Sequence, residues 1–199
     1  ATKPVIGVLA LQGDFAEHLT ALRKLNIPCV EVRTILDIQK TSGLIMPGGE
    51  STTIGKLLHS TGLDVWIKQH VQKGYAVYGT CAGAILLSKL GLIDMKVKRN
   101  AYGRQLDSFD EPIQVKTRFI PSPLRGVFIR APLITSVGKD VQVLATHHSD
   151  PVLVQQGNIL AGTFHPELTE NLAVHQYFAT LNFKKAAKWI WHFGSLLSA

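Results

Sequence analysis

Cysteine is scarce in this chain of 199 residues, which contains only Cys29 and Cys81. Two cysteines cannot form the disulfide framework of a small secreted protein, so we expect both thiols to be reduced. Neither a Cys-x-x-Cys nor a His-x-x-x-His spacing occurs, which argues against a structural zinc site. The sequence therefore predicts neither a disulfide-stabilised domain nor a structural metal centre.

Long hydrophobic runs are missing too, and none has the roughly 20 residues that a membrane-spanning helix needs. The first apolar run, Val5 to Leu11, is too short for a secretory signal and lacks the basic segment and cleavage site of one. These absences predict a cytoplasmic protein that works without a membrane. Linkers, repeats and low-complexity tracts are also absent, and 46% hydrophobic residues suffice for a sizeable core. We therefore expect one domain over residues 1–199.

Acidic residues are outnumbered, with 14 Asp and Glu against 21 Lys and Arg, for a net charge of +7. Such an excess can indicate nucleic-acid binding. However, the basic residues are scattered, and the densest groups, 96–99 and 184–188, lack the interleaved aromatic side chains that stack on bases. We therefore expect an ordinary basic surface and no nucleic-acid partner, and DNA binding remains an alternative that rests on charge alone.

What the sequence does contain is a regular alternation of strand and helix patterns in its first half. Short apolar runs predict strands over 4–11, 28–33, 43–49 and 75–80, and helical spacing predicts helices over 14–26, 51–62, 63–74 and 82–90. This alternation is typical of a parallel sheet with helices on both faces. In such sheets, functional groups gather beyond the carboxyl ends of the strands.

The second half changes to short strand-like runs between residues 93 and 167, with a hairpin turn signal at 155–158. A final helix is predicted over 170–193. The whole pattern predicts a three-layer α/β fold, in which a mostly parallel central sheet is flanked by helices and extended by antiparallel strands in the second half.

Cys81 lies in "GTCAG" (79–83), between a predicted strand and a predicted helix. Small residues on both sides of a reactive residue are typical of a nucleophile elbow, where larger side chains would clash. The amino end of the following helix also favours a thiolate over a thiol. The alternative is a buried, inert thiol, which is the usual fate of a free cysteine.

A base and its orienting group are found in "FHPE" (164–167), after another predicted strand. In extended chain His165 and Glu167 point to the same side, and Pro166 is expected to keep the segment non-helical. Glu167 could then hold the imidazole while His165 faces Cys81. Alone, each residue could be an ordinary loop histidine or a helix-start acid, but together with Cys81 they favour a triad.

Acyl transfer also needs donors for the oxyanion. The N–H of Ala82, next after the cysteine, is one candidate, and the turn "PGGES" (47–51) supplies another through Gly48 or Gly49. Glycine lets a backbone N–H approach a substrate closely. The alternative is an ordinary strand-to-helix turn.

The motifs "PGGEST" (47–52), "GTCAG" (79–83) and "FHPE" (164–167), in this order, resemble the class I glutamine amidotransferase family, whose members use a catalytic triad. Three further motifs look like those of one branch, the glutaminase subunits of pyridoxal 5′-phosphate synthases. They are "GVLALQGDFAEH" (7–18), "RNAYGRQLDSF" (99–109) and "FIRAP" (128–132). The resemblance covers nearly the whole chain.

The resemblance implies that Cys81 attacks the side-chain amide of glutamine, that His165 carries the proton and that Glu167 orients His165. Glutamate and ammonia would leave through a γ-glutamyl thioester, with an oxyanion hole built from Ala82 and from Gly48 or Gly49. The residues implied to contact glutamine are Gly49, Glu50, Ser51, Arg99, Ile129 and Arg130. Two arginines beside an acyl-transfer site suit a substrate with a carboxylate, although each could also be a solvated surface arginine.

The resemblance further implies a protein partner, a (β/α)₈ synthase subunit that receives the ammonia and makes pyridoxal 5′-phosphate within a large heteromeric complex. It also implies that the glutaminase is poorly active until this partner docks. Gln12 and Gly13 would sense this partner, and the chemistry would need no metal and no organic cofactor. Two alternatives remain: ammonia supplied to another biosynthetic enzyme, which 99–109 and 128–132 argue against, and a non-catalytic subunit, which the intact triad argues against.

Overall fold

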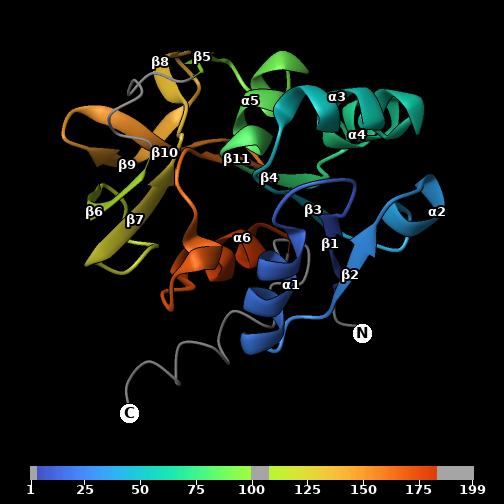
Figure 1. Ribbon diagram of the computed structural model, residues 1–199, viewed down its shortest axis with the longest axis horizontal. Coiled ribbons are helices and arrows are strands. Elements are labelled where there is room, and N and C mark those ends of the chain that lie inside the picture. The colour runs from blue at the N-terminus through green and yellow to red at the C-terminus, as the bar shows by residue number, and fades with distance from the viewer. Residues whose placement is uncertain (1–3, 100–107, 183–199) are drawn as a thin grey trace.

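The computed structural model describes residues 4–99 and 108–182 (Figure 1). Most of the motif at 99–109, and the part of the predicted last helix beyond residue 182, lie outside the described residues. Within the described part, no helix is both long and apolar enough to cross a membrane.

The central layer is a nine-stranded sheet in the order β2-β1-β3-β4-β11-β10-β9-β6-β7. Five neighbouring strands run parallel: β2 (Cys29–Val32), β1 (Ile6–Leu9), β3 (Gly43–Met46), β4 (Ala76–Thr80) and β11 (Ile159–Gly162). The antiparallel extension consists of β10 (Asp150–Gln156), β9 (Gln142–His147), β6 (Ser108–Val115) and β7 (Leu124–Ile129). A separate two-stranded sheet pairs β5 (Met95–Lys98) with β8 (Leu133–Val137).

Helices cover both faces of the parallel part of the sheet (Figure 1). On one face lie α1 (Phe15–Lys24) and α6 (Ala173–Asn182), and on the other lie α3 (Ser51–Ser60), α4 (Leu63–Val71) and α5 (Ala82–Lys89). Each face has its own apolar core. Leu19 of α1 and Phe178 of α6 belong to one buried cluster, whereas Ile54 of α3 and Ile67 of α4 belong to the other. The predicted three-layer α/β architecture is confirmed.

Three local expectations were wrong or incomplete. A one-turn helix, α2 (Ile35–Ile38), lies between the predicted strands 28–33 and 43–49, where the sequence predicted no helix, and Thr34 and Asp37 stabilise it with a reciprocal capping box. The run 124–134 is two strands in different sheets, because the backbone turns at Arg130, whose φ is +43°. The strand β11 joins the parallel part next to β4, although its neighbour β10 is antiparallel to it.

The parallel strands place the motifs of the sequence at one edge of the sheet. Strand β1 leads into Gln12 and Gly13, β3 leads into the 47–52 turn, β4 ends directly before Cys81, and β11 leads into His165. Since parallel strands end at the same edge, four segments that are distant in sequence come together there.

Candidate active site

Cys81 occupies a sharp turn between β4 and α5, with φ +50° and ψ −105°. A positive φ is uncommon for a residue with a side chain and costs free energy that the surrounding structure has to supply. Part of that support is the Cys81 N–H, which donates to the carbonyl oxygen of Gly162 over 2.8 Å. The turn has the backbone strain expected of a nucleophile elbow.

The glycines beside Cys81 are explained by close packing. A Cβ on Gly79 would lie 2.6 Å from the carbonyl carbon of Gly83. A Cβ on Gly83 would collide with the carbonyl oxygen of Met46 on β3. Both obstacles are backbone, which cannot yield as a flexible side chain does, so the turn requires glycine at these two positions.

His165 follows β11 and its imidazole is almost buried, with 8% of the side chain exposed. Its backbone N–H donates to the carbonyl oxygen of Val127 over 2.8 Å, which anchors the segment to β7. Its Nδ1 lies 2.6 Å from Oε1 of Glu167. The structure therefore brings this base and this carboxylate together, as the sequence predicted.

The conformation of this segment differs from the expected extended, non-helical chain. Residues Pro166–Leu168 form a short 3-10 helix, η1, with Pro166 in its first turn. Proline fits there because the first turn of a helix does not use its N–H. The turn directs Glu167 back towards His165, so the contact comes from a helical turn rather than from alternation along a strand.

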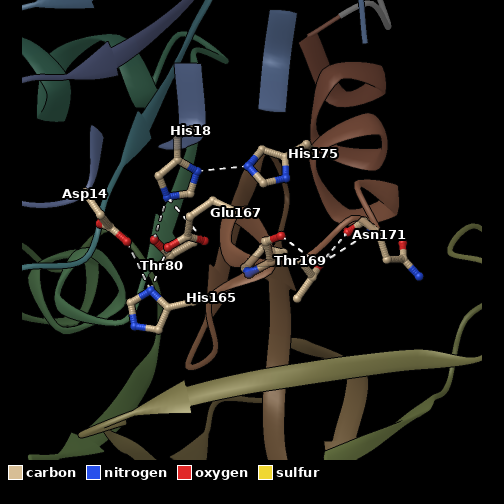
Figure 2. A network of polar contacts seen from close by, with 9 residues as sticks. Asp14, His18, Thr80, His165, Glu167, Thr169, Asn171 and His175 are labelled. Atoms are coloured by element: carbon tan, nitrogen blue, oxygen red, sulfur yellow. Dashed lines mark hydrogen bonds and ion pairs between the residues drawn. The ribbon is translucent and has the colours of Figure 1, made fainter. Parts of the chain in front are cut away.

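A second carboxylate, Asp14, which the sequence did not indicate, lies beside His165. Oδ2 of Asp14 lies 3.2 Å from Nδ1 of His165, so Asp14 and Glu167 approach the same ring nitrogen (Figure 2). The N–H of Asp14 also donates to the carbonyl oxygen of Gly48 over 3.3 Å, which ties the start of α1 to the 47–52 turn. Nothing in the local sequence around residue 14 indicates this contact.

The charges of this cluster are coupled. Burial alone would lower the pKa of His165, but its hydrogen bonds to Asp14, Cys81 and Glu167 outweigh burial and raise that pKa to about 12. Burial raises the pKa of Glu167 to about 8, which His165 partly opposes. Although burial raises the pKa of Asp14 as well, hydrogen bonds to His165 and Glu167 hold it well below its ordinary value. At neutral pH the imidazole of His165 is therefore protonated.

Cys81 and His165 share the wall of one cavity of about 480 Å³. This volume lies within the range of small-molecule sites. The other residues that line it are Gln12, Gly49, Glu50, Ser51, Ala82, Ile85, Arg99, Ile129, Arg130 and Pro132. The cavity thus collects nearly all of the site residues that the sequence singled out, and Gly13, Gly48 and Glu167 lie outside its lining.

The two glycines of the 47–52 turn occupy different places. Gly49, with φ +145°, lines the cavity together with Ala82, the first residue of α5. Gly48 instead packs against the base, since a Cβ there would lie 2.7 Å from Cε1 of His165. Because the first N–H groups of a helix have no partner within it, the N–H of Ala82 is available at the cavity.

Gln12 and Gly13 pack closely against the 47–52 turn. The side-chain oxygen of Gln12 accepts the N–H of Glu50 over 2.8 Å. Gly13 has φ +99°, and a Cβ there would collide with the carbonyl oxygen of Gly48. A movement of this segment would therefore be transmitted directly to the backbone of the 47–52 turn.

The polar end of the cavity is formed by Glu50, Ser51 and Arg99. The Glu50 carboxylate caps α3 and accepts the N–H groups of Thr52 at 3.0 Å and Thr53 at 2.7 Å, which lower its pKa to about 2. The guanidinium of Arg99 contacts the hydroxyl of Ser51 and lies 3.6 Å from the Glu50 carboxylate. Glu50 therefore has a structural function as a helix cap, whatever else it contacts.

Ile129 is the last residue of β7, and Arg130 follows it. The carbonyl oxygen of Ile129 lies 3.9 Å from Sγ of Cys81 and accepts its hydrogen bond. Arg130, in a left-handed conformation, lines the same cavity. Because the backbone turns at Arg130, the chain leaves β7 there, and Ile129 and Arg130 both line the cavity that Cys81 lines.

Two groups of described side chains have ligand atoms close enough for a metal ion, within 4.8 Å of one another. One is Asp14, His165 and Glu167, whose contacts are the hydrogen bonds just described. The other is Glu111, His147 and His148, on β6 and at the end of β9. Neither group involves Cys81, and the absence of a cofactor remains a prediction from the sequence.

The sequence model of the SNO glutamine amidotransferase family matches residues 8–184 of the chain. A protein of Pseudothermotoga lettingae named pyridoxal 5′-phosphate synthase subunit PdxT is 50% identical over 186 residues, which are 87% of this chain and 93% of that protein. A protein of Thermus thermophilus with the same name is 49% identical over 188 residues, covering 89% of this chain and 97% of that protein.

A solved structure described as a glutamine amidotransferase superimposes with a TM-score of 0.85 at 47% sequence identity. The alignment covers 89% of this chain and 98% of that one. The family match over residues 8–184 includes the segments that carry Cys81 and His165.

Proposed function

The chain belongs to the SNO glutamine amidotransferase family, and from this premise we propose that it hydrolyses L-glutamine to L-glutamate and ammonia as the glutaminase subunit of a pyridoxal 5′-phosphate synthase. The observation that carries the proposal is the strained elbow of Cys81, which opens into the same cavity as His165. Relatives that bear the name of a synthase subunit, at 49–50% identity, support the assignment.

The proposed reaction begins when the Cys81 thiolate attacks the amide carbon of the glutamine side chain. His165, protonated and hydrogen-bonded to Cys81, gives a proton to the departing nitrogen, and ammonia leaves. A γ-glutamyl thioester on Cys81 remains. Water then attacks the thioester and gives a proton to His165, and the Cys81 sulfur leaves as a thiolate. Glutamate is released, and the thiolate beside protonated His165 is restored. The sum is glutamine plus water giving glutamate plus ammonia.

The oxyanion of both tetrahedral steps would be stabilised by backbone N–H groups. Ala82 lies directly after the nucleophile at the amino end of α5, and Gly49 faces it across the cavity wall. Preorganised donors of this kind contribute about 3–4 kcal/mol each to acyl transfer. Of the two glycines named by the sequence, we favour Gly49, because Gly48 packs against the His165 ring.

Recognition of glutamine would rest on the two arginines that line the cavity. Arg99 and Arg130 lie on different segments, and each could bind the α-carboxylate of the substrate. The Ser51 hydroxyl and the Glu50 backbone would complete the polar end, and Ile129 would pack beside the substrate chain. A side-chain amide deep in the pocket and an α-carboxylate near its mouth fit this distribution of charge.

The ammonia would pass to a (β/α)₈ synthase subunit that forms pyridoxal 5′-phosphate. We propose that docking of this partner is sensed by Gln12 and Gly13, because both press on the turn that carries Gly49. A shift of the Gln12–Glu50 hydrogen bond would reorient the N–H groups of that turn. The glutaminase would then reach its full rate only in the complex.

The proposal is tested by measuring glutamate release from glutamine, with and without the synthase subunit, for the wild type and for Cys81→Ala. We expect release by the wild type, stimulation by the partner, and loss of at least about a thousandfold in Cys81→Ala. Undiminished release by Cys81→Ala would refute the mechanism. Failure of the synthase subunit to bind, with activity intact, would point instead to another ammonia-using partner.

A further inference from the structure

Behind Glu167, away from the substrate cavity, lies a buried chain of polar side chains that the proposed mechanism does not use (Figure 2). His18 of α1 and His175 of α6 are fully buried, and Nδ1 of His18 lies 2.9 Å from Nε2 of His175. The other ring nitrogen of His18, Nε2, lies 3.2 Å from the hydroxyl of Thr80 and 3.6 Å from Oε2 of Glu167. The chain thus joins two helices of one face to the carboxylate that orients the base.

Both histidines are neutral at pH 7. Burial lowers the pKa of His18 to about 4, and burial also lowers the pKa of His175 well below its ordinary value. A neutral imidazole has one N–H donor and one acceptor nitrogen. The direction of every hydrogen bond in the chain then depends on which nitrogen of each ring carries the proton.

One assignment of these protons fits the contacts better than the other. If the His175 Nε2–H donates to Nδ1 of His18, then the His18 Nε2–H faces Thr80 and Glu167, both of which can accept it. The opposite assignment turns the lone pair of His18 towards the Glu167 carboxylate. It also puts a proton on His175 Nδ1, a buried atom with no hydrogen-bond partner among the described residues. An orphaned donor and a lone pair against a carboxylate both cost free energy.

Glu167 needs a donor on this side. Its Oε1 contacts His165, but its Oε2 is buried and has no hydrogen-bond partner among the described residues. Because burial raises the pKa of Glu167 to about 8, an additional donor is required to hold the carboxylate charged at neutral pH. At 3.6 Å, the N–H of His18 needs a shift of well under 1 Å to reach hydrogen-bonding distance.

We propose that His18, held in place by His175, is a positioning residue that presents its Nε2–H to Glu167 and so keeps that carboxylate charged and aimed at His165. The proposal deepens the proposed function and rests on it, since it concerns the same triad. His18 touches neither the substrate cavity nor Cys81; it acts through Glu167. The donors then run from His175 through His18 to Glu167, and the Glu167 carboxylate also accepts the Nδ1–H of His165 from its other side.

The test compares His18→Leu, which removes the donor, with His18→Gln, whose amide N–H₂ can replace Nε2–H. Glutamate release is measured in the complex with the synthase subunit as a function of pH. We expect kcat to fall about 10- to 100-fold in His18→Leu with a smaller change in KM, and to recover largely in His18→Gln. The matched control is Tyr78→Phe, which removes a buried hydroxyl without a hydrogen-bond partner among the described residues and should retain wild-type kinetics.

The pH dependence of kcat/KM distinguishes a positioning role of His18 from a loss of packing in His18→Leu. With a less charged Glu167, the raised pKa of His165 falls, so the alkaline limb of kcat/KM moves to lower pH in His18→Leu. The titratable groups around His18 are Asp14, Tyr78, His165, Glu167 and His175, and all are unchanged in both His18 variants.

Two outcomes would overturn the inference while the proposed function stands. One is a kcat of His18→Leu equal to that of the wild type. The other is an equal loss of kcat in His18→Leu and His18→Gln without a shift of the alkaline limb of kcat/KM. A wild type that releases no more glutamate than Cys81→Ala would instead overturn the proposed function itself. If His18→Leu does not fold, His175→Gln tests the same chain, because it changes the support of His18 and leaves its N–H in place. The inference then requires that His175→Gln lower kcat and shift the alkaline limb of kcat/KM, both by less than is expected for His18→Leu. A pH profile equal to that of the wild type would contradict it.

Discussion

At the scale of single residues, the site depends on a few side chains whose environments differ sharply from the usual surface. Cys81 is set apart from Cys29, the other thiol, by its backbone and its neighbour. Cys81 has a positive φ and faces a protonated imidazole, whereas burial raises the pKa of the Cys29 thiol. The structure thus places the two cysteines in different environments.

Asp14 is predicted to stabilise the fold through its contact with His165. Asp14→Asn should lower the free energy of unfolding at pH 7 by about 1–3 kcal/mol, because it removes a charged acceptor from a protonated ring. Folding lowers the pKa of Asp14 below its ordinary 3.8. The stabilisation is therefore present above about pH 4 and is lost as the pH falls towards the lower folded value.

Urea unfolding of the wild type and of Asp14→Asn, at pH 7 and at pH 3, measures this difference. Asp140→Asn, in an exposed turn before β9, is the control and should change little at either pH. A difference between wild type and Asp14→Asn that is as large at pH 3 as at pH 7 would show that the charge of Asp14 is not the cause.

The sequence indicated Cys81, His165 and Glu167 because each follows a predicted strand and belongs to a short motif. It could not indicate Asp14, which is 151 residues away from His165 along the chain. Nor could it indicate the His18–His175 contact, since two histidines on two amphipathic helices are more often unrelated. Such contacts depend on how α1, α6 and η1 are placed around the sheet, which local patterns do not specify.

At the scale of elements, the elbow requires that β3, β4 and α5 approach one another very closely. Gly83→Ala should therefore destabilise the protein by about 1–3 kcal/mol, since the added methyl group meets the Met46 carbonyl oxygen. The matched control is Gly55→Ala in α3, which is also a glycine within a helix. A Cβ on Gly55 would lie 3.3 Å from the end of the Leu86 side chain, which is flexible, and would meet no backbone of another element among the described residues.

Alanine is favoured over glycine in a helix by about 1 kcal/mol, so Gly55→Ala should be neutral or slightly stabilising. Thermal or urea unfolding of the two variants measures the contrast. Equal stabilities for Gly83→Ala and Gly55→Ala would mean that close packing is not the reason for glycine beside Cys81.

The alternation of elements was predictable because parallel strands are apolar throughout and helices repeat with their own period. The errors occurred where these signals are weak. Helix α2 has a single turn, which is too short to show a period, although its Thr34–Asp37 capping box is visible in the sequence. The break at Arg130 lies inside a run whose strand-like pattern continues on both sides of it, and the 3-10 turn at Pro166 comes from a residue that also suits extended chain.

At the scale of the whole molecule, the fold brings four strand ends together and leaves Gln12 and Gly13 in contact with the 47–52 turn. Gln12→Ala should reduce the ratio of partner-stimulated to basal glutamate release, because it removes the acceptor of the Glu50 N–H. Gln39→Ala, at the exposed end of α2, is the control. Full stimulation of Gln12→Ala by the synthase subunit would contradict the proposed sensing.

The central claim is covalent catalysis by Cys81, and the most direct test is to detect its acyl intermediate. The complex is mixed with isotopically labelled glutamine, quenched in acid within the first turnovers, digested, and analysed by mass spectrometry. We predict a labelled glutamyl group on the peptide that contains Cys81, and none on the peptide that contains Cys29 or in Cys81→Ala. Steady release of labelled glutamate without any label on Cys81, or with label on Cys29, would contradict the account.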